Sequence, residues 1–473
     1  MTGLLVSLFL PWIAGSTWLW RTWRTANLPA VLGYGYLLGI LVTTALIRLW
    51  HFAGLELEFW PLAAGLALVA ALPLLLPGRT AREEPPRPGN GPSHWWSAEN
   101  LVFAFFLFLI ALRLGSILLD NIYRPLFSWD AWMNFAPKAR VWFELGELTP
   151  YTSPKDWLRG ASLEGAFTLG NWQAWDYPVT VPLVMLWTAL GLDAWHDDLI
   201  KFPWVFVGAA LGLAVYGQFR HFGISRHTAM VLVYLLLSIP YVNVHMVLGG
   251  YADLWLATAL SLGLLSLMRW TTTQHQTDLA LALLFAVSCF AIKKPGVIWG
   301  GLLLASIGLA LVPRRITLVL AGFFAITATA LWIAGGIDIN LPAIGRLRID
   351  AGGIALPYLG QQPLGFTNVS TVFVDSLFLS PNWHLFWYAL VVALMLALTT
   401  RPARLRQPAP FFFTVTSVVA ILFIFFMIPR YSKEALELTT LNRALLHLVP
   451  SLFVFAIWWL WARPAEPAPL PEP

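Results

Sequence analysis

The sequence predicts an all-α polytopic membrane protein, on three observations. Of its 473 residues, 58% are hydrophobic and only 11% are charged, against about 25% charged residues in ordinary soluble domains. The mean hydropathy is +0.70, so the chain has too few polar side chains to cover a water-soluble globule. Its 26 tryptophans fit the same class, because aromatic residues are enriched at membrane–water interfaces. The composition excludes a soluble enzyme, a disordered chain and a collagen-like fibre, and the single cysteine, Cys289, excludes an internal disulfide framework.

Continuous apolar stretches, about 17–22 residues long and able to cross a bilayer as helices, recur along the chain. A porin-like barrel is not expected, because its strands would alternate apolar and polar residues. The stretches lie at 4–20, 29–50, 60–77, 100–119, 199–219, 228–245, 253–269, 278–292, 295–312, 316–336, 384–400, 410–428 and 445–462. A further apolar stretch at 178–192 is short and opens with proline, and it decides the orientation of every later helix.

Basic residues set the expected orientation, because cytoplasmic loops carry an excess of Lys and Arg. If the arginine-rich loop at 79–87 faces the cytoplasm, 178–192 must be a re-entrant or surface helix for the later arginine-rich loops to face it too. We therefore expect thirteen spans, with the N-terminus outside and the C-terminus inside. Residues 120–198 and 337–383 then form two long extracytoplasmic segments.

Three parts follow from this layout. Residues 1–98 form an N-terminal three-helix membrane segment, and residues 99–463 form the transmembrane core that carries both outer segments. Residues 464–473 form a Pro-rich cytoplasmic tail, expected to be disordered. Within the first outer segment, an amphipathic juxtamembrane helix is expected to lie in the membrane interface. Its apolar face comprises Trp132, Phe135, Ala139, Trp142 and Phe143.

Lysines lie where positive-inside logic would exclude them. All six lysines fall on the expected outer side, and Lys293 and Lys294 occupy a tight turn between two apolar helices. Such charges need a partner, and a lipid phosphate suits Lys and Arg. Arg443 begins the last span, where a cation opposes the helix dipole, so a negative group is expected nearby. Arg430 precedes the same span and offers a second guanidinium for phosphate.

Two aspartates are candidates for chemistry. Asp130 lies between Trp129 and Trp132, and desolvation by two indoles would favour a general base. The alternative is a helix N-cap, a role also open to Ser128. Asp253 begins a span after a Gly-Gly turn and is either functional or an N-cap.

Arg113 is an ionisable residue inside an otherwise apolar span, IALRLGSILLD. It either serves a site, snorkels to the interface or pairs with Asp120. The chain has no Walker loop, GxSxG or CxxC motif, so nothing indicates nucleotide hydrolysis or redox work.

The order of several motifs resembles the GT-C superfamily of membrane glycosyltransferases over about residues 100–462. The likeness is nearest to the branch of protein O-mannosyltransferases and the lipid A aminoarabinose transferase. The motifs are WDAWMNFAPKARVWFELGEL after a helix that ends outside, YPVTVPLVMLWTALG, LIKFPWVFVGAALGLAVYGQFRHFG, the acidic turn GGYADLWLA, and then AIKKPGVIW and LNRALLHLVP. The resemblance implies a GT-C-like bundle of about 13 transmembrane helices with juxtamembrane helices in its extracytoplasmic loops.

The resemblance also implies an activity. A sugar would pass, with inversion, from a polyprenyl-phosphate donor to a hydroxyl of a lipid, glycan or protein acceptor, on the periplasmic or extracellular face of a bacterial inner membrane. Asp130 would be the base, and Asp253 would orient the acceptor or bind a metal. Six basic residues are candidates for holding the departing lipid phosphate. They are Lys293, Lys294, Arg443, Arg430, Lys138 and Arg113.

The resemblance leaves the cofactor open and gives no role to nucleic acid. A divalent metal is the one cofactor it allows, yet Ala131 stands where many relatives carry a second acidic residue beside the base. Two other functions compete with this interpretation. One is an O-antigen ligase or polymerase with a polyprenyl-diphosphate donor, and the other is a lipid or solute transporter.

Overall fold

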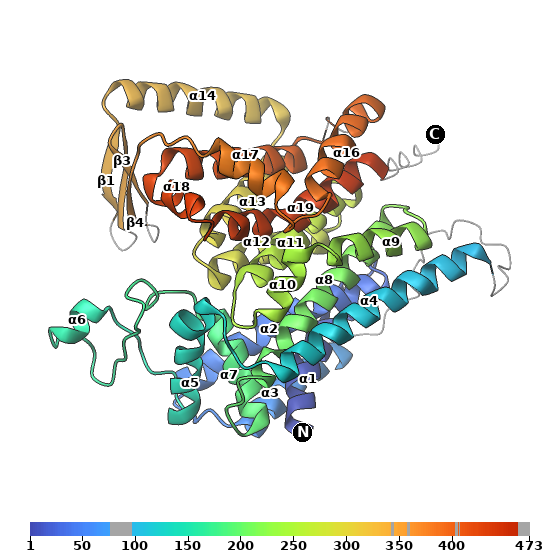
Figure 1. Ribbon diagram of the computed structural model, residues 1–473, viewed down its shortest axis with the longest axis vertical. Helices are drawn as coiled ribbons and strands as arrows, with labels where there is room; N and C mark the ends of the chain where they lie inside the picture. The colour runs from blue at the N-terminus through green and yellow to red at the C-terminus, as the bar shows by residue number, and fades with distance from the viewer. Residues whose placement is uncertain (76–96, 342–344, 357–359, 403–404, 406, 462–473) are drawn as a thin grey trace.

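The computed structural model describes residues 1–75, 97–341, 345–356, 360–402, 405 and 407–461, and most of these residues are helical (Figure 1). The first half of the chain contains α1 (Thr2–Thr22), α2 (Leu28–Phe52), α3 (Phe59–Ala71), η1 (Leu72–Leu75), α4 (Ala98–Tyr123), η2 (Ala131–Phe135), α5 (Ala136–Leu145), α6 (Pro154–Leu158), α7 (Thr180–Leu192), η3 (Leu199–Lys201), α8 (Phe202–His221), α9 (Arg226–Leu237) and α10 (Pro240–Val247). The second half contains α11 (Asp253–Thr273), α12 (Gln276–Ile292), α13 (Gly296–Leu311), α14 (Arg314–Ile333), β1 (Ile337–Leu341), β2 (Gly345–Asp350), β3 (Gly353–Leu356), β4 (Gly360–Pro363), α15 (Ser370–Val374), η4 (Asp375–Leu379), α16 (Phe386–Thr400), α17 (Pro408–Met427), α18 (Pro429–Leu436) and α19 (Leu441–Trp461).

The multi-pass character of the chain is evident from its long apolar helices. Each of the thirteen expected stretches contains a helix where the structure describes it. Among the described residues, seven helices are long and apolar enough to cross a membrane, or eight if α9 and α10 form one span bent by 65°. Others, such as α3, α12, α13 and α16, are shorter apolar helices. The count of thirteen spans therefore stays a prediction, and the tail at 464–473 lies outside the described residues.

Helix α7 corrects the expectation of a surface helix at 178–192. Every residue from Thr180 to Gly191 is buried, and α7 packs against α1, α2 and α5. Its 13 residues span about 20 Å at 1.5 Å per residue, which is less than the hydrocarbon core of about 30 Å. Residues 180–192 therefore form an internal helix, and the re-entrant alternative remains.

The fold is mainly helical, as expected, and a small sheet accompanies the helices. Strands β1 to β4 form an antiparallel meander in the order β1-β2-β3-β4, within the second long segment. In the register, Ile337 pairs with Ile349, and Ile354 pairs with both Ile349 and Gln362. The sequence 345–350 alternates polar and apolar residues, a pattern typical of strands. The sheet and α6 project from the same end of the molecule, opposite the C-terminus (Figure 1).

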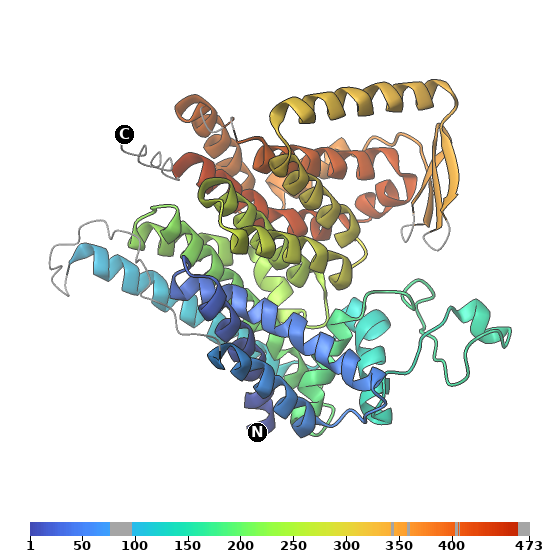
Figure 2. The same cartoon turned by 180° about the vertical axis from the view of Figure 1, so that it is seen from behind.

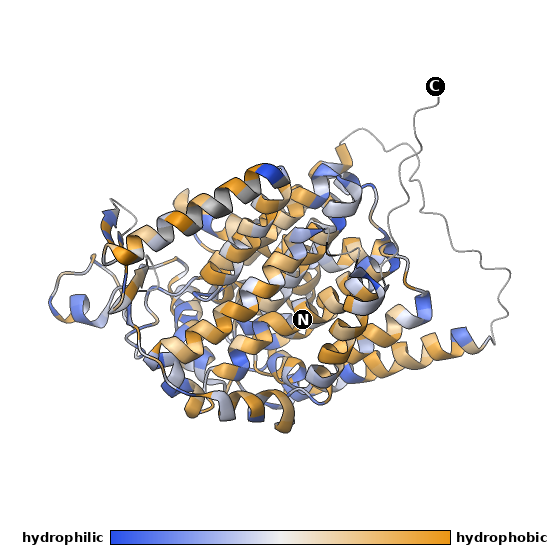
Figure 3. Ribbon diagram, turned by 90° about the horizontal axis from the view of Figure 1, so that it is seen from above, coloured by the Kyte–Doolittle hydropathy of each residue, from blue (hydrophilic) through white to orange (hydrophobic). Residues whose placement is uncertain are grey.

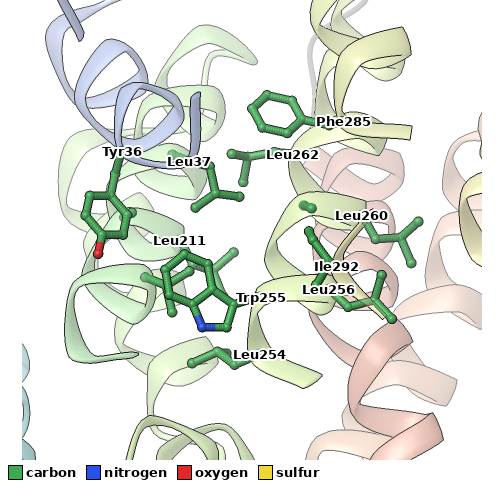
Figure 4. Packing of buried hydrophobic residues seen from close by; sticks show 14 of the residues in the cluster. Tyr36, Leu37, Leu211, Leu254, Trp255, Leu256, Leu260, Leu262, Phe285 and Ile292 are labelled. Atoms are coloured by element: carbon green, nitrogen blue, oxygen red, sulfur yellow. The ribbon is translucent and has the colours of Figure 1, made fainter. Parts of the chain in front are cut away.

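Helix α11 lies at the centre of the core. In the most apolar 18-residue stretch of α11, 94% of the residues are buried, whereas in that of α4 only 11% are buried. Trp255, Leu256 and Leu262 of α11 lie among side chains of α2, α8 and α12 (Figure 4). The outer helices are rich in apolar residues, as the hydropathy colours show (Figure 3), and Phe108 of α4 is one exposed apolar side chain. Such a surface suits lipid rather than water.

The N-terminal segment shares this core. Helix α1 packs on α2, and α2 packs on α8 (Figure 2). The Trp23 indole donates a 2.6 Å hydrogen bond to Asp278 at the start of α12. Asp278 also pairs with Arg269 of α11 at 3.0 Å, both side chains being fully buried. This ion pair closes one end of the α11–α12 hairpin, and a second pair closes the other.

Candidate functional site

Four predicted site residues meet at one end of the helix bundle. Asp130 lies in the loop before η2, Asp253 is the first residue of α11, Lys293 directly follows α12, and Arg443 lies in the first turn of α19. These segments are far apart in sequence, yet the four side chains form one network of ion pairs. We call this group of four residues the ion cluster. The structure thus brings together both candidate catalytic aspartates and two of the candidate phosphate ligands.

Asp253 is the most enclosed member of the ion cluster. Its Oδ1 accepts from Lys293 Nζ at 2.6 Å and faces His447 Nε2 at 2.8 Å, while its Oδ2 accepts from Arg443 Nη2 at 2.9 Å. The side chain is 0% exposed, and the N-cap position of α11 belongs to Ala252. The N-cap interpretation of Asp253 is therefore wrong, because three cross-helix donors occupy its carboxylate.

Asp130 contacts the same guanidinium as Asp253. Arg443 donates from Nη1 and Nη2 to the two carboxylate oxygens of Asp130, in the fork geometry that favours carboxylates. The Asp130 side chain is 7% exposed and that of Arg443 is 20% exposed, and the guanidinium carbon lies 4.5 Å from the centre of the Tyr251 ring. Asp130 also makes no capping hydrogen bond.

Asp130 is only 5% exposed, in agreement with the expected desolvation. The flanking Trp129 and Trp132 are themselves 63% and 57% exposed. Phe135, Ala139 and Trp142 of the predicted apolar face are buried as expected, but Trp132 departs from that face because η2 is a π-helix. A π-helix has more residues per turn than an α-helix, and this shifts the register of side chains before α5.

A glycine turn fixes the loop that carries Asp130. Ser128 donates to the Gly249 carbonyl at 2.7 Å, so Ser128 also does not cap a helix. Gly250 adopts a φ of 92°, and a Cβ on it would lie 2.4 Å from the Ala131 Cβ. Only glycine suits this conformation and this close approach. Ala131 is 0% exposed, so the packing leaves no room for a second acidic side chain beside Asp130.

His447 is a member of the site that sequence reasoning missed. Its Nδ1 lies 3.1 Å from the Trp299 indole nitrogen. An indole N–H only donates, so Nδ1 must be the acceptor and the ring proton must lie on Nε2. His447 is therefore a neutral imidazole that donates to Asp253. The available signal was its spacing of four residues from Arg443, which places both side chains on one helical face.

A strap formed by residues 171–177 lies beside the ion cluster. Asp176 pairs with Lys294 at 2.6 Å, and the Gln173 side chain accepts from Arg430 at 2.7 Å. Lys138 of α5 is buried and donates to the backbone carbonyls of Trp175 and Tyr177. Lys138 therefore fixes the strap, while Lys294 and Arg430 reach it from the other half of the molecule.

Arg113 takes a different position from the other predicted phosphate ligands. Its guanidinium carbon lies 5.8 Å from the centre of the Tyr234 ring, on the α4–α9 contact. The predicted alternative partner, Asp120, pairs instead with Arg124 at 2.9 Å. The structure thus does not bring Arg113 to the ion cluster.

Charge is balanced within the ion cluster, where two carboxylates face two cations. Lys294 and Arg430 also have acidic partners, Asp176 and Glu434. A phosphate would therefore have to compete with carboxylates at each of these four cations. Lys294 and Arg430 are the easiest to reach, because their side chains are 28% and 45% exposed.

The described part of the site lacks the usual set of side chains that bind a metal ion. Over the described residues, no group of three or more His, Cys, Asp or Glu side chains is arranged to hold a metal ion. His245 is buried, and its Nδ1 lies within hydrogen-bonding distance of the Tyr241 carbonyl, at 3.1 Å. In comparisons with protein-family models, curated proteins and solved structures, no match to the chain was found.

Proposed function

We propose that the chain is a membrane glycosyltransferase that moves a sugar from a polyprenyl-phosphate donor to an acceptor hydroxyl. The observation that carries the proposal is the approach of Asp130, from the first long inter-helix segment, to the cations Arg443 and Lys293. This is the arrangement that the GT-C resemblance implies. We place the reaction on the periplasmic or extracellular face of a bacterial inner membrane.

In the proposed reaction, the acceptor oxygen attacks the anomeric carbon from the face opposite the phosphate. The bond from that carbon to the phosphate oxygen breaks, and its electron pair leaves with the polyprenyl phosphate. The hydroxyl proton passes to the Asp130 carboxylate, which Arg443 orients. Lys294 and Arg430 would stabilise the charge on the leaving phosphate, since they are the most exposed of these cations.

The test is the variant Asp130→Asn, assayed with a polyprenyl-monophosphate sugar and membrane extract as the acceptor source. Loss of a general base lowers rates by about 10²–10⁴-fold, so we expect transfer to be lost while donor binding and folding persist. The matched control is Asp197→Asn, which changes an exposed carboxylate outside the ion cluster. Near-normal transfer by Asp130→Asn would refute the base assignment. Activity only with a polyprenyl-diphosphate donor would favour a ligase or polymerase.

One observation favours a transporter as the second candidate. Helices α9 and α10 are together long and apolar enough to cross a membrane but are bent by 65° at their break, and broken helices are typical of transporter binding sites. α10 packs against α11, the helix that begins with Asp253. Reconstitution into vesicles that contain a fluorescent phosphatidylglycerol would detect lipid movement by quenching from outside. Movement that survives Asp130→Asn, without transfer in wild type, would favour transport.

A further inference from the structure

We infer that Arg443 is the permanent cation between Asp130 and Asp253, in the place where the GT-C resemblance allows a divalent metal. The geometry of the ion cluster carries this inference, and only its catalytic meaning rests on the proposed function. If it is correct, the two carboxylates form a metal-independent pair whose bridging charge belongs to the chain itself.

Every carboxylate oxygen of the pair already accepts a hydrogen bond from a basic side chain. Asp253 uses Oδ1 for Lys293 and His447 and Oδ2 for Arg443. Asp130 places both oxygens on Arg443. A divalent cation such as Mg²⁺ requires about six oxygen ligands in near-octahedral geometry. To bridge the two aspartates, it would have to compete with the guanidinium that already bridges them.

The neighbouring positions offer no replacement ligands. Ala131 is packed against Gly250, so a tandem carboxylate beside Asp130 is absent. His447 directs its Nε2–H at Asp253, and its Nδ1 lone pair is taken by the Trp299 indole. An imidazole binds a metal through a free nitrogen lone pair. His447 therefore cannot serve as a ligand in this arrangement.

The net charge of the ion cluster also disfavours a divalent metal ion. The two carboxylates balance Arg443 and Lys293, so a divalent ion added to the ion cluster would leave a buried excess of positive charge. Uncompensated buried charge is strongly unfavourable. Removing the Arg443 guanidinium reverses the situation. Two carboxylates would then face a vacated space with only Lys293 to neutralise them, which is a site that attracts a divalent cation.

The experiment is a titration of the purified full chain with Mn²⁺, followed by electron paramagnetic resonance. Wild type should show no Mn²⁺ bound at the ion cluster. Arg443→Ala should bind one Mn²⁺, with an affinity at least about tenfold above any wild-type binding, because the unpaired carboxylates gain a cation. Arg443→Ala combined with Asp253→Asn should lose that binding. Arg430→Ala is the control, since it removes one nearby positive charge without freeing either aspartate.

Two outcomes would overturn the inference. One is Mn²⁺ bound by wild type and lost in Asp253→Asn. The other is a folded Arg443→Ala that binds no Mn²⁺. If Arg443→Ala does not fold, Arg443→Gln keeps part of the side-chain volume, and the wild-type titration still decides. The Mn²⁺ result does not depend on any transfer activity. Failure of the proposed function would appear separately, as absence of transfer by a wild type that binds no metal.

Discussion

At the scale of single residues, the protonation of His447 is fixed by an indole. The Trp299 N–H donates to Nδ1, and Nε2 donates to Asp253. The charged groups around the ring are Asp253, Lys293 and Arg443. A second proton on Nδ1 would face the indole N–H, so the imidazole stays neutral. The positioning of Asp253 therefore depends on a residue that carries no charge.

We predict that Trp299→Phe releases this constraint. In ¹⁵N NMR of histidine-labelled protein, wild-type His447 should keep the signature of the neutral Nε2–H tautomer as the buffer is acidified. The variant should show a second proton on Nδ1, because the donor that excluded it is gone. Trp387→Phe is the control, since Trp387 is also buried but its indole nitrogen makes no hydrogen bond. A wild-type ring that protonates like the variant would contradict the assignment.

At the scale of elements, the strap at 171–177 depends on one buried lysine. Burial lowers the pKa of Lys138 from its ordinary 10.5 to about 8. The unfolded chain therefore keeps this proton at pH values where the folded chain has lost it. The contribution of Lys138 to the free energy of unfolding should therefore increase as the pH rises from about 8 to 10.5. Below that window, the cost of burying the charge is fully present.

We predict that Lys138→Met changes both the level and the slope of stability. At pH 7 the variant loses two hydrogen bonds from a charged donor to backbone carbonyls, each contributing about 1.5–3 kcal/mol. This loss is offset in part because no charge is buried. In thermal unfolding in detergent, the Tm of wild type should increase relative to that of the variant as the pH rises through this window. Lys155→Met, on exposed α6, should show no such trend. Parallel curves for wild type and Lys138→Met would contradict the lowered pKa.

The charges at two helix ends show which part of the site could be predicted from the sequence. Arg443 opposes its helix dipole and Lys293 opposes the positive-inside trend, so both were expected to have a negative partner. The structure supplies carboxylates as those partners, Asp130 and Asp253. The sequence could not identify them, because 190 residues separate Arg443 from Asp253 and only the packing of α19 on α11 joins them. Local patterns fix which charges need partners, while tertiary packing chooses the partners.

The burial of α7 and the small sheet were not predicted from the sequence, for two different reasons. The burial of α7 had no signal in the sequence, since a short apolar helix reads the same inside a protein or at a membrane. The sheet did have one, in the alternation along 345–350, but the apolar composition of the whole chain outweighed it. Short strands in a membrane protein are therefore best sought by periodicity within the long loops.

At the scale of the whole molecule, helix polarity places the ion cluster and both long segments at one end. Asp253 begins α11, whereas His275 follows its end, so the two lie about 31 Å apart along a 21-residue helix. The segment with α6 projects on the same side of the molecule as the sheet (Figure 1), and Asp176 of that segment pairs with Lys294 beside the ion cluster. The expected orientation puts that end outside the cell and His275 in the cytoplasm.

Labelling by a membrane-impermeant maleimide tests this orientation in intact cells. We predict that Glu164→Cys reacts from outside and that His275→Cys reacts only after permeabilisation, because both positions are exposed at opposite ends of the molecule. The native Cys289 is 0% exposed, so unmodified protein should give little background. The reverse pattern would put the ion cluster on the cytoplasmic side. An extracytoplasmic polyprenyl-phosphate sugar could not then reach Asp130. The proposed reaction therefore requires the expected orientation.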